Sequence, residues 1–217
     1  MLQQTQVNTV VPYFQRFISA FPDVEHLARA DLQTVLKHWE GMGYYARARH
    51  LHRSAQQILE LFNGEIPANW KELRELPGIG DYIASAVLSI AFAQPYAVVD
   101  GNAKRVLARL FKIEAPVNQA RGLMTFKATA DKLLDPLNPG IFNQAIMELG
   151  AVVCIPRHPK CDICPLQSDC AAFSSASIHK YPLRVARKPV PKYHTAVGVI
   201  YRQERVLITR RPTEGLL

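Results

Sequence analysis

All four cysteines of the chain lie in one short segment, CIPRHPKCDICPLQSDC, which covers residues 154–170. Their spacing is C-x6-C-x2-C-x5-C, so the thiols either converge on one partner or remain unligated. Structural zinc sites more often join two C-x2-C pairs from separate knuckles, whereas four thiolates on one loop also suit a [4Fe–4S] cluster. From this chemistry alone zinc and iron–sulfur stay equally open, and both are favoured over unligated thiols. Because no cysteine is left for a disulfide framework, we expect a cytoplasmic protein.

The rest of the composition is that of an ordinary globular protein. The chain has 217 residues, 48% of them hydrophobic, which is enough for one large domain or two small ones. No apolar run reaches the roughly 20 residues of a membrane-spanning helix, and no signal peptide is visible. The net charge of +8 favours a polyanionic partner, although a solvated basic surface explains it equally well.

Hydrophobic periodicity predicts a mainly helical chain. Apolar residues from Val7 to Phe21 recur at helical spacing, and Asp23 and Asp31 are typical N-caps of the next two helices. Further helical stretches are predicted over residues 46–62, 82–93 and within 101–150. A basic, proline-rich stretch then leads into TAVGVIYRQERVLITRRP, whose alternation is typical of a β-hairpin.

Three segments together resemble the endonuclease III superfamily of DNA glycosylases: the cysteine loop, LPGIGDYIASAV and the AVVDGN that follows it. The resemblance implies a helix-hairpin-helix glycosylase fold, in which a six-helix barrel is joined to an iron–sulfur domain. It implies a [4Fe–4S] cluster held by Cys154, Cys161, Cys164 and Cys170. Arg157 would then contact DNA phosphates, with charge balance beside the anionic cluster as the alternative explanation.

LPGIGDYIASAV resembles the hairpin with which this superfamily contacts DNA. Gly78 and Gly80 allow positive φ and close approach of the backbone to a partner. The amides that open the next helix, near Tyr82, would face a phosphate at the positive end of the helix dipole. Taken alone, PGIG is a plain turn between helices, and its place before VVDGN is what indicates DNA binding.

The resemblance assigns the catalytic aspartate to Asp100, which directly precedes the basic segment GNAKRVLARL. A helix N-terminus and nearby cations favour the ionised carboxylate. Cleavage of an N-glycosidic bond develops positive charge on the sugar, so a fixed anion can stabilise or capture that centre. Asn102 would support the sugar and the attacking water. In isolation, Asp-Gly-Asn is more simply explained as a helix cap.

Tyr82 separates the two branches of the superfamily. Members that also nick the strand carry a lysine at this hairpin position as a Schiff-base nucleophile, and tyrosine cannot form an imine. The resemblance therefore implies a monofunctional hydrolytic enzyme in which Tyr82 lies near Asp100. Packing of a half-buried tyrosine is the alternative explanation.

Three further segments, MLQQTQV, GMGYYARARHLH and FNQAIMELGA, closely resemble the MutY family of adenine-specific mismatch glycosylases. This implies excision of adenine opposite 8-oxoguanine or guanine in double-stranded DNA, and we expect a monomer. By the same match, Gln4 would fill the gap in the duplex with Leu2 beside the extruded base. Tyr44 would wedge the mispair open, and Gln144 would face the adenine edge. Without the resemblance, Leu2 and Tyr44 are predicted to be core residues, and the two glutamines surface residues.

The resemblance also divides the chain into parts. We expect a six-helix domain at 1–98, an iron–sulfur domain at 99–174, a linker at 175–194 and the start of a Nudix-like domain at 195–217. It places the general-acid glutamate of the family two positions before Met1, so we expect this stretch of chain to be severely impaired in excision. Two alternatives stay open: a pyrimidine-lesion glycosylase with lyase activity, and a non-catalytic iron–sulfur module that binds DNA.

Overall fold

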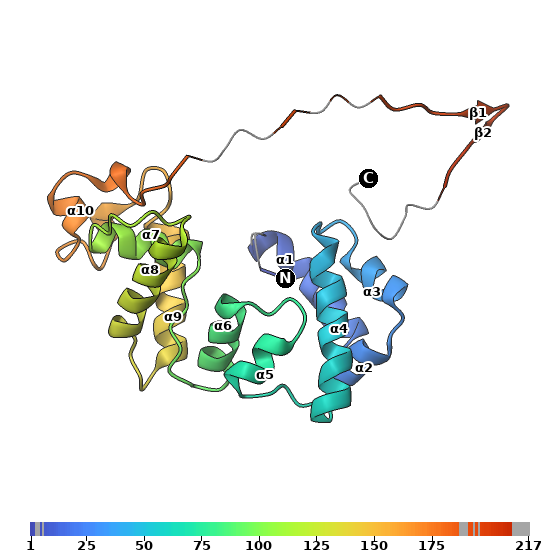
Figure 1. Cartoon of the computed structure of the whole chain (residues 1–217), viewed down its shortest axis with the longest axis horizontal. Helices are drawn as coiled ribbons and strands as arrows, with labels where there is room; N and C mark the ends of the chain where they lie inside the picture. The colour runs from blue at the N-terminus through green and yellow to red at the C-terminus, as the bar shows by residue number, and fades with distance from the viewer. Residues whose placement is uncertain (3–4, 6, 187–190, 193, 195, 210–217) are drawn as a thin grey trace. The chain divides into compact units, whose positions relative to one another are not determined.

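The computed structural model describes residues 1–2, 5, 7–186, 191–192, 194 and 196–209. The chain forms two compact units, Met1–Val185 and Ala186–Leu217, called unit 1 and unit 2 below. Every helix of the described residues lies in unit 1, which confirms the prediction of a mainly α fold (Figure 1). The finer division of unit 1 at residue 98 stays a prediction. None of the helices described is long and apolar enough to span a membrane.

The first four helices of unit 1 share one hydrophobic core. They are α1 (Val7–Ala20), α2 (Val24–Arg29), α3 (Leu32–Trp39) and α4 (Tyr45–Phe62). Asp23 and Asp31 begin α2 and α3 as predicted, because each carboxylate accepts a backbone N–H three residues later. Such a cap contributes about 1 kcal/mol. Trp39 and Val35 are fully buried in the core between these helices.

Only part of the predicted apolar stripe on α1 is buried. Val10 and Phe17 lie in the core, together with Phe21 just after the helix. The other large apolar side chains of the stripe are exposed: Val7, Val11, Phe14 and Ile18. Helical spacing predicts which residues share a face, but not how much of that face a neighbouring element covers.

The middle of unit 1 is a helical hairpin. Asn69 begins α5 (Trp70–Glu75) by accepting two backbone N–H groups, and the segment LPGIG connects it to α6 (Asp81–Ala91). Leu73 and Leu88 are fully buried and pack both helices against α4.

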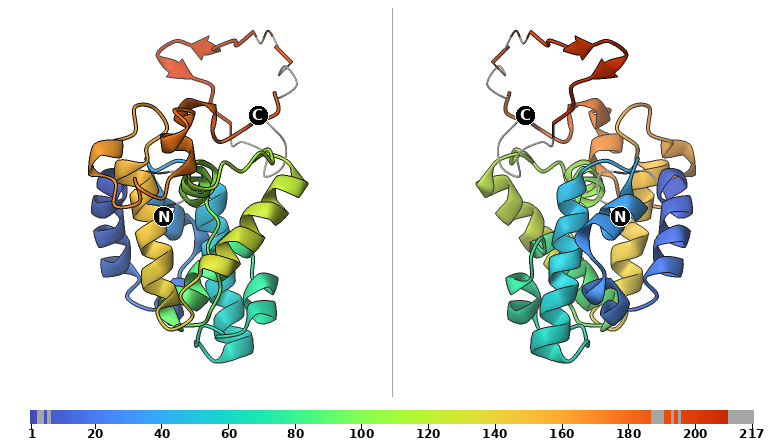
Figure 2. Two further views of the ribbon diagram at one scale, coloured as in Figure 1. Left: turned by 90° about the vertical axis from the view of Figure 1, so that its left-hand side faces the viewer. Right: turned by 90° about the vertical axis from the view of Figure 1, so that its right-hand side faces the viewer.

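The second half of unit 1 is built on α7 (Gly101–Leu110), α8 (Ala120–Leu133) and α9 (Pro139–Glu148). α9 packs against both α6 and α7, so it joins the hairpin to this half of the unit (Figure 2). Phe126 and Leu107 form the centre of a second core. After Glu148 the chain continues into a π-helical segment, η1 (Leu149–Val153), which ends at Cys154. Such π-helical turns often occur at functional sites.

The cysteine segment folds against α7. It contains three short helices, η2 (Cys161–Ile163), α10 (Ala171–Ser174) and η3 (Ile178–Lys180). α10 packs on α7, and Ala172 and Tyr181 are buried in the second core. One helix therefore begins at Asp100 and supports the cysteine loop near its other end.

Unit 2 contains the predicted β-hairpin. Strands β1 (Tyr201–Arg202) and β2 (Arg205–Val206) are antiparallel, and Tyr201 pairs with Val206. Every described residue of this unit is exposed. Two strands without a buried face are at best marginally stable in water. The relation of this unit to Nudix-like domains stays a prediction.

Candidate functional site

Asp100 ends an irregular segment and begins α7. Its carboxylate Oδ1 accepts the backbone N–H of Ala103 at 2.6 Å, and the side chain is half-buried. As the N-cap, this carboxylate lies at the positive end of the helix dipole. The sequence interpretation as a helix cap is confirmed, and it is compatible with a second role because a carboxylate has a further oxygen to offer.

Tyr82 lies on the first turn of α6, within range of the negative charge of Asp100. Burial, and secondarily the negative charge of Asp100, raise the pKa of the Tyr82 phenol above its ordinary value. The phenol is therefore protonated at neutral pH and keeps a hydrogen to donate. A hydrogen bond between Tyr82 and Asp100 stays a prediction.

Asn102 is held in place by Arg105, one turn along α7. Arg105 Nη2 donates to Asn102 Oδ1 at 2.8 Å and to the Gly150 carbonyl at 2.6 Å. Its Nε donates to the Cys154 carbonyl at 2.7 Å. Gly150 is required at this crossing, because a Cβ there would lie 2.6 Å from the Cβ of Asn102. Arg105 thus links the head of α7 to the first cysteine.

Arg109 is the main support of the cysteine loop, and sequence reasoning did not single it out. Its side chain is 4% exposed. It donates to backbone carbonyls at Tyr181, Cys154, Ile155 and Pro156 and to the sulfur of Cys154, with N···O distances of 2.8–3.5 Å and N···S of 3.3 Å. The sequence did place Arg109 four residues after Arg105, on the same face of α7, and this spacing could have indicated that both arginines contact the same segment.

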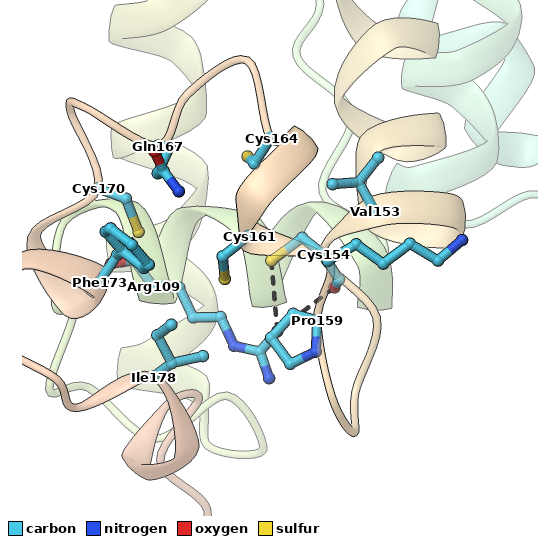
Figure 3. A pocket seen from close by; sticks show the side chains of 11 residues that line it. Arg109, Val153, Cys154, Pro159, Cys161, Cys164, Gln167, Cys170, Phe173 and Ile178 are labelled. Atoms are coloured by element: carbon cyan, nitrogen blue, oxygen red, sulfur yellow. Dashed lines mark hydrogen bonds between the residues drawn. The ribbon is translucent and has the colours of Figure 1, made fainter.

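The cysteines line one pocket, shown in Figure 3 with Arg109 at its edge. All four are partly buried, and the other lining residues include Val153, Pro159, Phe173 and Ile178. Burial, and secondarily the charge of the other thiolates, raise the pKa of the Cys161 thiol. Thiolates must form when metal binds, so binding releases protons here.

Four thiols beside an apolar wall and a buried guanidinium fit an anionic iron–sulfur cluster, because the cation offsets cluster charge and the wall excludes water. Among the residues that the structure describes, no three Cys, His, Asp or Glu side chains are grouped closely enough to hold a single metal ion. The fit to a cluster rests on the donor set and the pocket, not on a preformed ligand geometry.

The hairpin between α5 and α6 is braced from two sides. Ser54 of α4 donates to the Pro77 carbonyl at 2.8 Å. Arg74 of α5 donates to the Ile79 carbonyl at 2.5 Å and forms an ion pair with Asp81 at 2.6 Å. Two backbone groups of the turn are thereby fixed, and the carboxylate at the start of α6 is neutralised.

The two hairpin glycines differ. Gly78 uses positive φ, at +77°, and a Cβ there would lie 2.7 Å from the Cβ of His50, whereas its close approach to a partner stays a prediction. Gly80 is different: its φ is −90°, and a Cβ would meet nothing within 4 Å. The freedom that glycine allows is therefore not used at Gly80, because this residue is the extended N-cap of α6.

Residues 1–125 match the model of the HhH-GPD superfamily of base excision DNA repair proteins. The chain belongs to this superfamily. Residues 154–170, from the first to the last cysteine, match the iron–sulfur binding domain of endonuclease III. The cysteine loop therefore binds a [4Fe–4S] cluster, and the zinc alternative is set aside.

Curated relatives within the superfamily carry the name adenine DNA glycosylase. The Schizosaccharomyces pombe protein is 41% identical over 180 residues, which are 82% of this chain and 39% of that protein. The Homo sapiens protein is 44% identical over 173 residues, 79% of this chain and 32% of that protein. The protein of Buchnera aphidicola subsp. Baizongia pistaciae is 34% identical over 217 residues, all of this chain and 61% of that protein. The chain thus spans between 32% and 61% of the length of these relatives.

Solved structures of the superfamily share the fold. A thermostable thymine-DNA glycosylase superposes with a TM-score of 0.73 at 27% identity, covering 80% of each chain. An endonuclease III trapped covalently on DNA gives 0.70 at 23% identity, covering 81% of each chain. The second likeness supports the fold alone.

The remaining predicted contact residues lie on the surface of unit 1. Leu2 is 59% exposed and Tyr44 is 63% exposed, so the interpretation of both as core residues was wrong. Tyr44 has φ +51°, which is unusual for a residue with a side chain, and the Arg47 guanidinium lies 5.1 Å from its ring centre. Hydrophobic character alone predicts that Leu2 and Tyr44 are buried, and only the resemblance to the superfamily predicts that they are exposed for contact with DNA.

Gln144 and Arg157 are exposed as predicted. Gln144 Nε2 donates to the Gly140 carbonyl one turn earlier, at 3.1 Å. Arg157 lies on the segment between Cys154 and Cys161. Gln4 falls outside the described residues. The functional roles assigned to these side chains stay predictions.

Proposed function

We propose that the full-length protein is a monofunctional DNA glycosylase that hydrolyses the N-glycosidic bond of adenine opposite 8-oxoguanine or guanine. The observation that carries this proposal is the Asp100 carboxylate fixed at the start of α7, with a tyrosine, Tyr82, at the hairpin position where the lyase branch has lysine. The names of the curated relatives support adenine as the base.

Asp100 would act as the fixed anion of the reaction. As the purine leaves, the sugar becomes cationic, and a carboxylate already held by a helix cap stabilises that charge without reorganising. Tyr82 would donate its phenolic hydrogen within the same site, and Asn102, held by Arg105, would orient the sugar and the water. Asp100 and Asn102 are fixed before substrate binds, which is the condition for electrostatic catalysis.

Duplex DNA would lie against two parts of unit 1. The hairpin offers the start of α6 to a phosphate, and Arg157 and Lys160 of the cysteine loop are exposed cations. Tyr44 would enter the duplex beside the mispair, and Gln144 would read the adenine edge. Extrusion of a base costs a few kcal/mol, which stacking and polar contacts of this kind offset.

The direct test is adenine release by the full-length protein. We expect excision from an A:8-oxoguanine duplex, slower excision from A:G, and none from A:T. Tight binding of the mispair without base release would instead support a non-catalytic DNA-binding module.

Borohydride trapping separates the hydrolytic from the lyase mechanism. Because a phenol cannot form an imine, we expect no covalent protein–DNA adduct when the enzyme is reduced with borohydride on abasic-site DNA. The measurement is the fraction of labelled DNA shifted on a denaturing gel. Stoichiometric trapping would contradict monofunctional chemistry and favour the pyrimidine-lesion lyase.

The Arg74–Asp81 pair is expected to support DNA binding by the hairpin. In R74Q, the Ile79 carbonyl loses its partner, and the Asp81 carboxylate is left uncompensated at the phosphate position. We expect affinity for duplex DNA to fall by about fivefold, and R74Q/D81N to recover part of it. The matched control is R29Q, which breaks the exposed Arg29–Glu25 pair on α2. Equal dissociation constants for R74Q and R29Q would refute this role.

A further inference from the structure

Asn143 of α9 is a buried amide whose hydrogen-bonding groups are all engaged. It is 2% exposed. Its Oδ1 accepts the backbone N–H of Val98 at 2.9 Å, and its Nδ2 donates to the Tyr96 carbonyl at 2.8 Å and to Ser89 Oγ at 2.9 Å. The orientation of the amide is determined by these partners, because the reverse orientation would oppose its oxygen to the Tyr96 carbonyl.

The segment held by Asn143 is the one that carries Asp100. Residues 93–100 have no regular secondary structure, so their buried backbone groups need partners from elsewhere in the fold. Asn143 supplies two such partners, at residues 96 and 98, and Asp100 follows two residues later. Ala97 and Val98 are buried, so water does not replace the amide there.

α9 approaches this segment closely because Gly140 has no side chain. A Cβ at Gly140 would lie 2.7 Å from the Ser89 carbonyl oxygen of α6. The close crossing brings Ser89 and Asn143 into contact. The Ser89 hydroxyl accepts a hydrogen bond from Asn143 and donates one to the Ala86 carbonyl of the same helix. The segment of residues 93–100, which ends at Asp100, is thus held where α6 and α9 cross.

The next residue of α9 faces outward. Gln144 is exposed, as expected for a neighbour about 100° further round the helix. One turn of α9 therefore carries an inward amide that holds the Asp100 segment and an outward amide assigned above to the adenine.

We propose that Asn143 is a positioning residue for base excision, which fixes Asp100 relative to the adenine-facing Gln144. This inference rests on the proposed function. It concerns placement of the carboxylate against the sugar, so loss of Asn143 should slow the chemical step and not DNA binding. Misplacement of a reacting group by about 1 Å costs on the order of 100-fold in rate.

The test is single-turnover excision by the full-length protein, with the rate constant expressed per active site from the burst amplitude. Leucine has a branched side chain of similar shape but cannot form the three hydrogen bonds. In N143L we therefore expect a rate constant lower by about 100-fold. The dissociation constant for a duplex with a tetrahydrofuran abasic site opposite 8-oxoguanine should stay within about threefold of wild type, because Asn143 does not contact DNA.

Two further variants separate positioning from stability. S89A removes the α6 partner but keeps both bonds to residues 96 and 98, so its rate constant should stay within about twofold of wild type even where its Tm falls. N143D keeps the acceptor for Val98, and its buried carboxyl group donates to Tyr96 only when protonated. The N143D rate, as a ratio to wild type at the same pH, should therefore rise as pH falls from about 8 to about 6.

Wild-type rate constants per active site in folded N143L would overturn the proposal. If N143L does not fold, N143D decides: a ratio to wild type near one at both pH values would overturn it. An S89A rate as low as that of N143L would also overturn it, since stability alone would then explain both. If the wild-type protein releases no adenine, both the proposed function and this inference are overturned. If the wild type is active, D100N is inactive and N143L has a normal rate constant, the inference alone is overturned.

Discussion

In D100N, we expect adenine excision to fall by about 1,000-fold or more, with little change in stability or in DNA affinity. Asparagine is as good an N-cap as aspartate, so the bond to the Ala103 N–H and the start of α7 are retained. The variant removes only the negative charge that would face the sugar. The measurement is the single-turnover rate constant on an A:8-oxoguanine duplex, together with Tm and the dissociation constant.

The matched control for D100N is D31N. Asp31 caps α3 in the same way, through the Thr34 N–H, and is exposed. D31N should keep the wild-type rate. Near-normal excision by D100N would contradict the assignment of Asp100 as the catalytic anion.

R109M is expected to have the largest effect on stability and on retention of the cluster. The substitution keeps the aliphatic stem but leaves the carbonyls of Tyr181, Ile155 and Pro156 without this donor, whereas the Cys154 carbonyl keeps its bond to Arg105. Each unsatisfied buried group costs about 1–3 kcal/mol, so we expect a loss of about 3 kcal/mol or more. For a unit of this size the corresponding fall in Tm is about 6–12 °C.

Iron content per chain, visible absorbance of the cluster and Tm are the measurements for R109M. R121M is the control, because Arg121 is exposed on α8. R109M with full iron content and unchanged Tm would show that the loop does not depend on this guanidinium.

Helix identity and helix starts were largely predictable because they depend on neighbouring residues. Asp23 and Asp31 cap through bonds that span three residues, and PGIG turns where Gly78 supplies positive φ. Gly80 shows the limit of this argument, since a glycine permits positive φ but does not require it. The exposed half of the α1 stripe shows a second limit, because periodicity does not reveal what covers a face.

The candidate site was predictable where short motifs carry its chemistry. The cysteine spacing, Asp100 at a helix start and Tyr82 in the hairpin were visible in the sequence, and the structure places Asp100 at the N-cap of α7 and Tyr82 on the first turn of α6. The supports of the site were not visible. Arg105, Arg109 and Asn143 look like an ordinary basic helix face and an ordinary polar residue until their partners are known.

By itself, the sequence determined the cluster-binding thiols and most of the helical elements, and it indicated the carboxylate and the phenol to which the proposed chemistry is assigned. Only the tertiary structure decided how these residues are held, because Asn143 bonds to residue 98 across 45 positions and Arg109 to residue 156 across 47. A buried polar side chain must satisfy its hydrogen bonds wherever the fold brings a partner, and that place is set by the packing of helices and not by the local sequence.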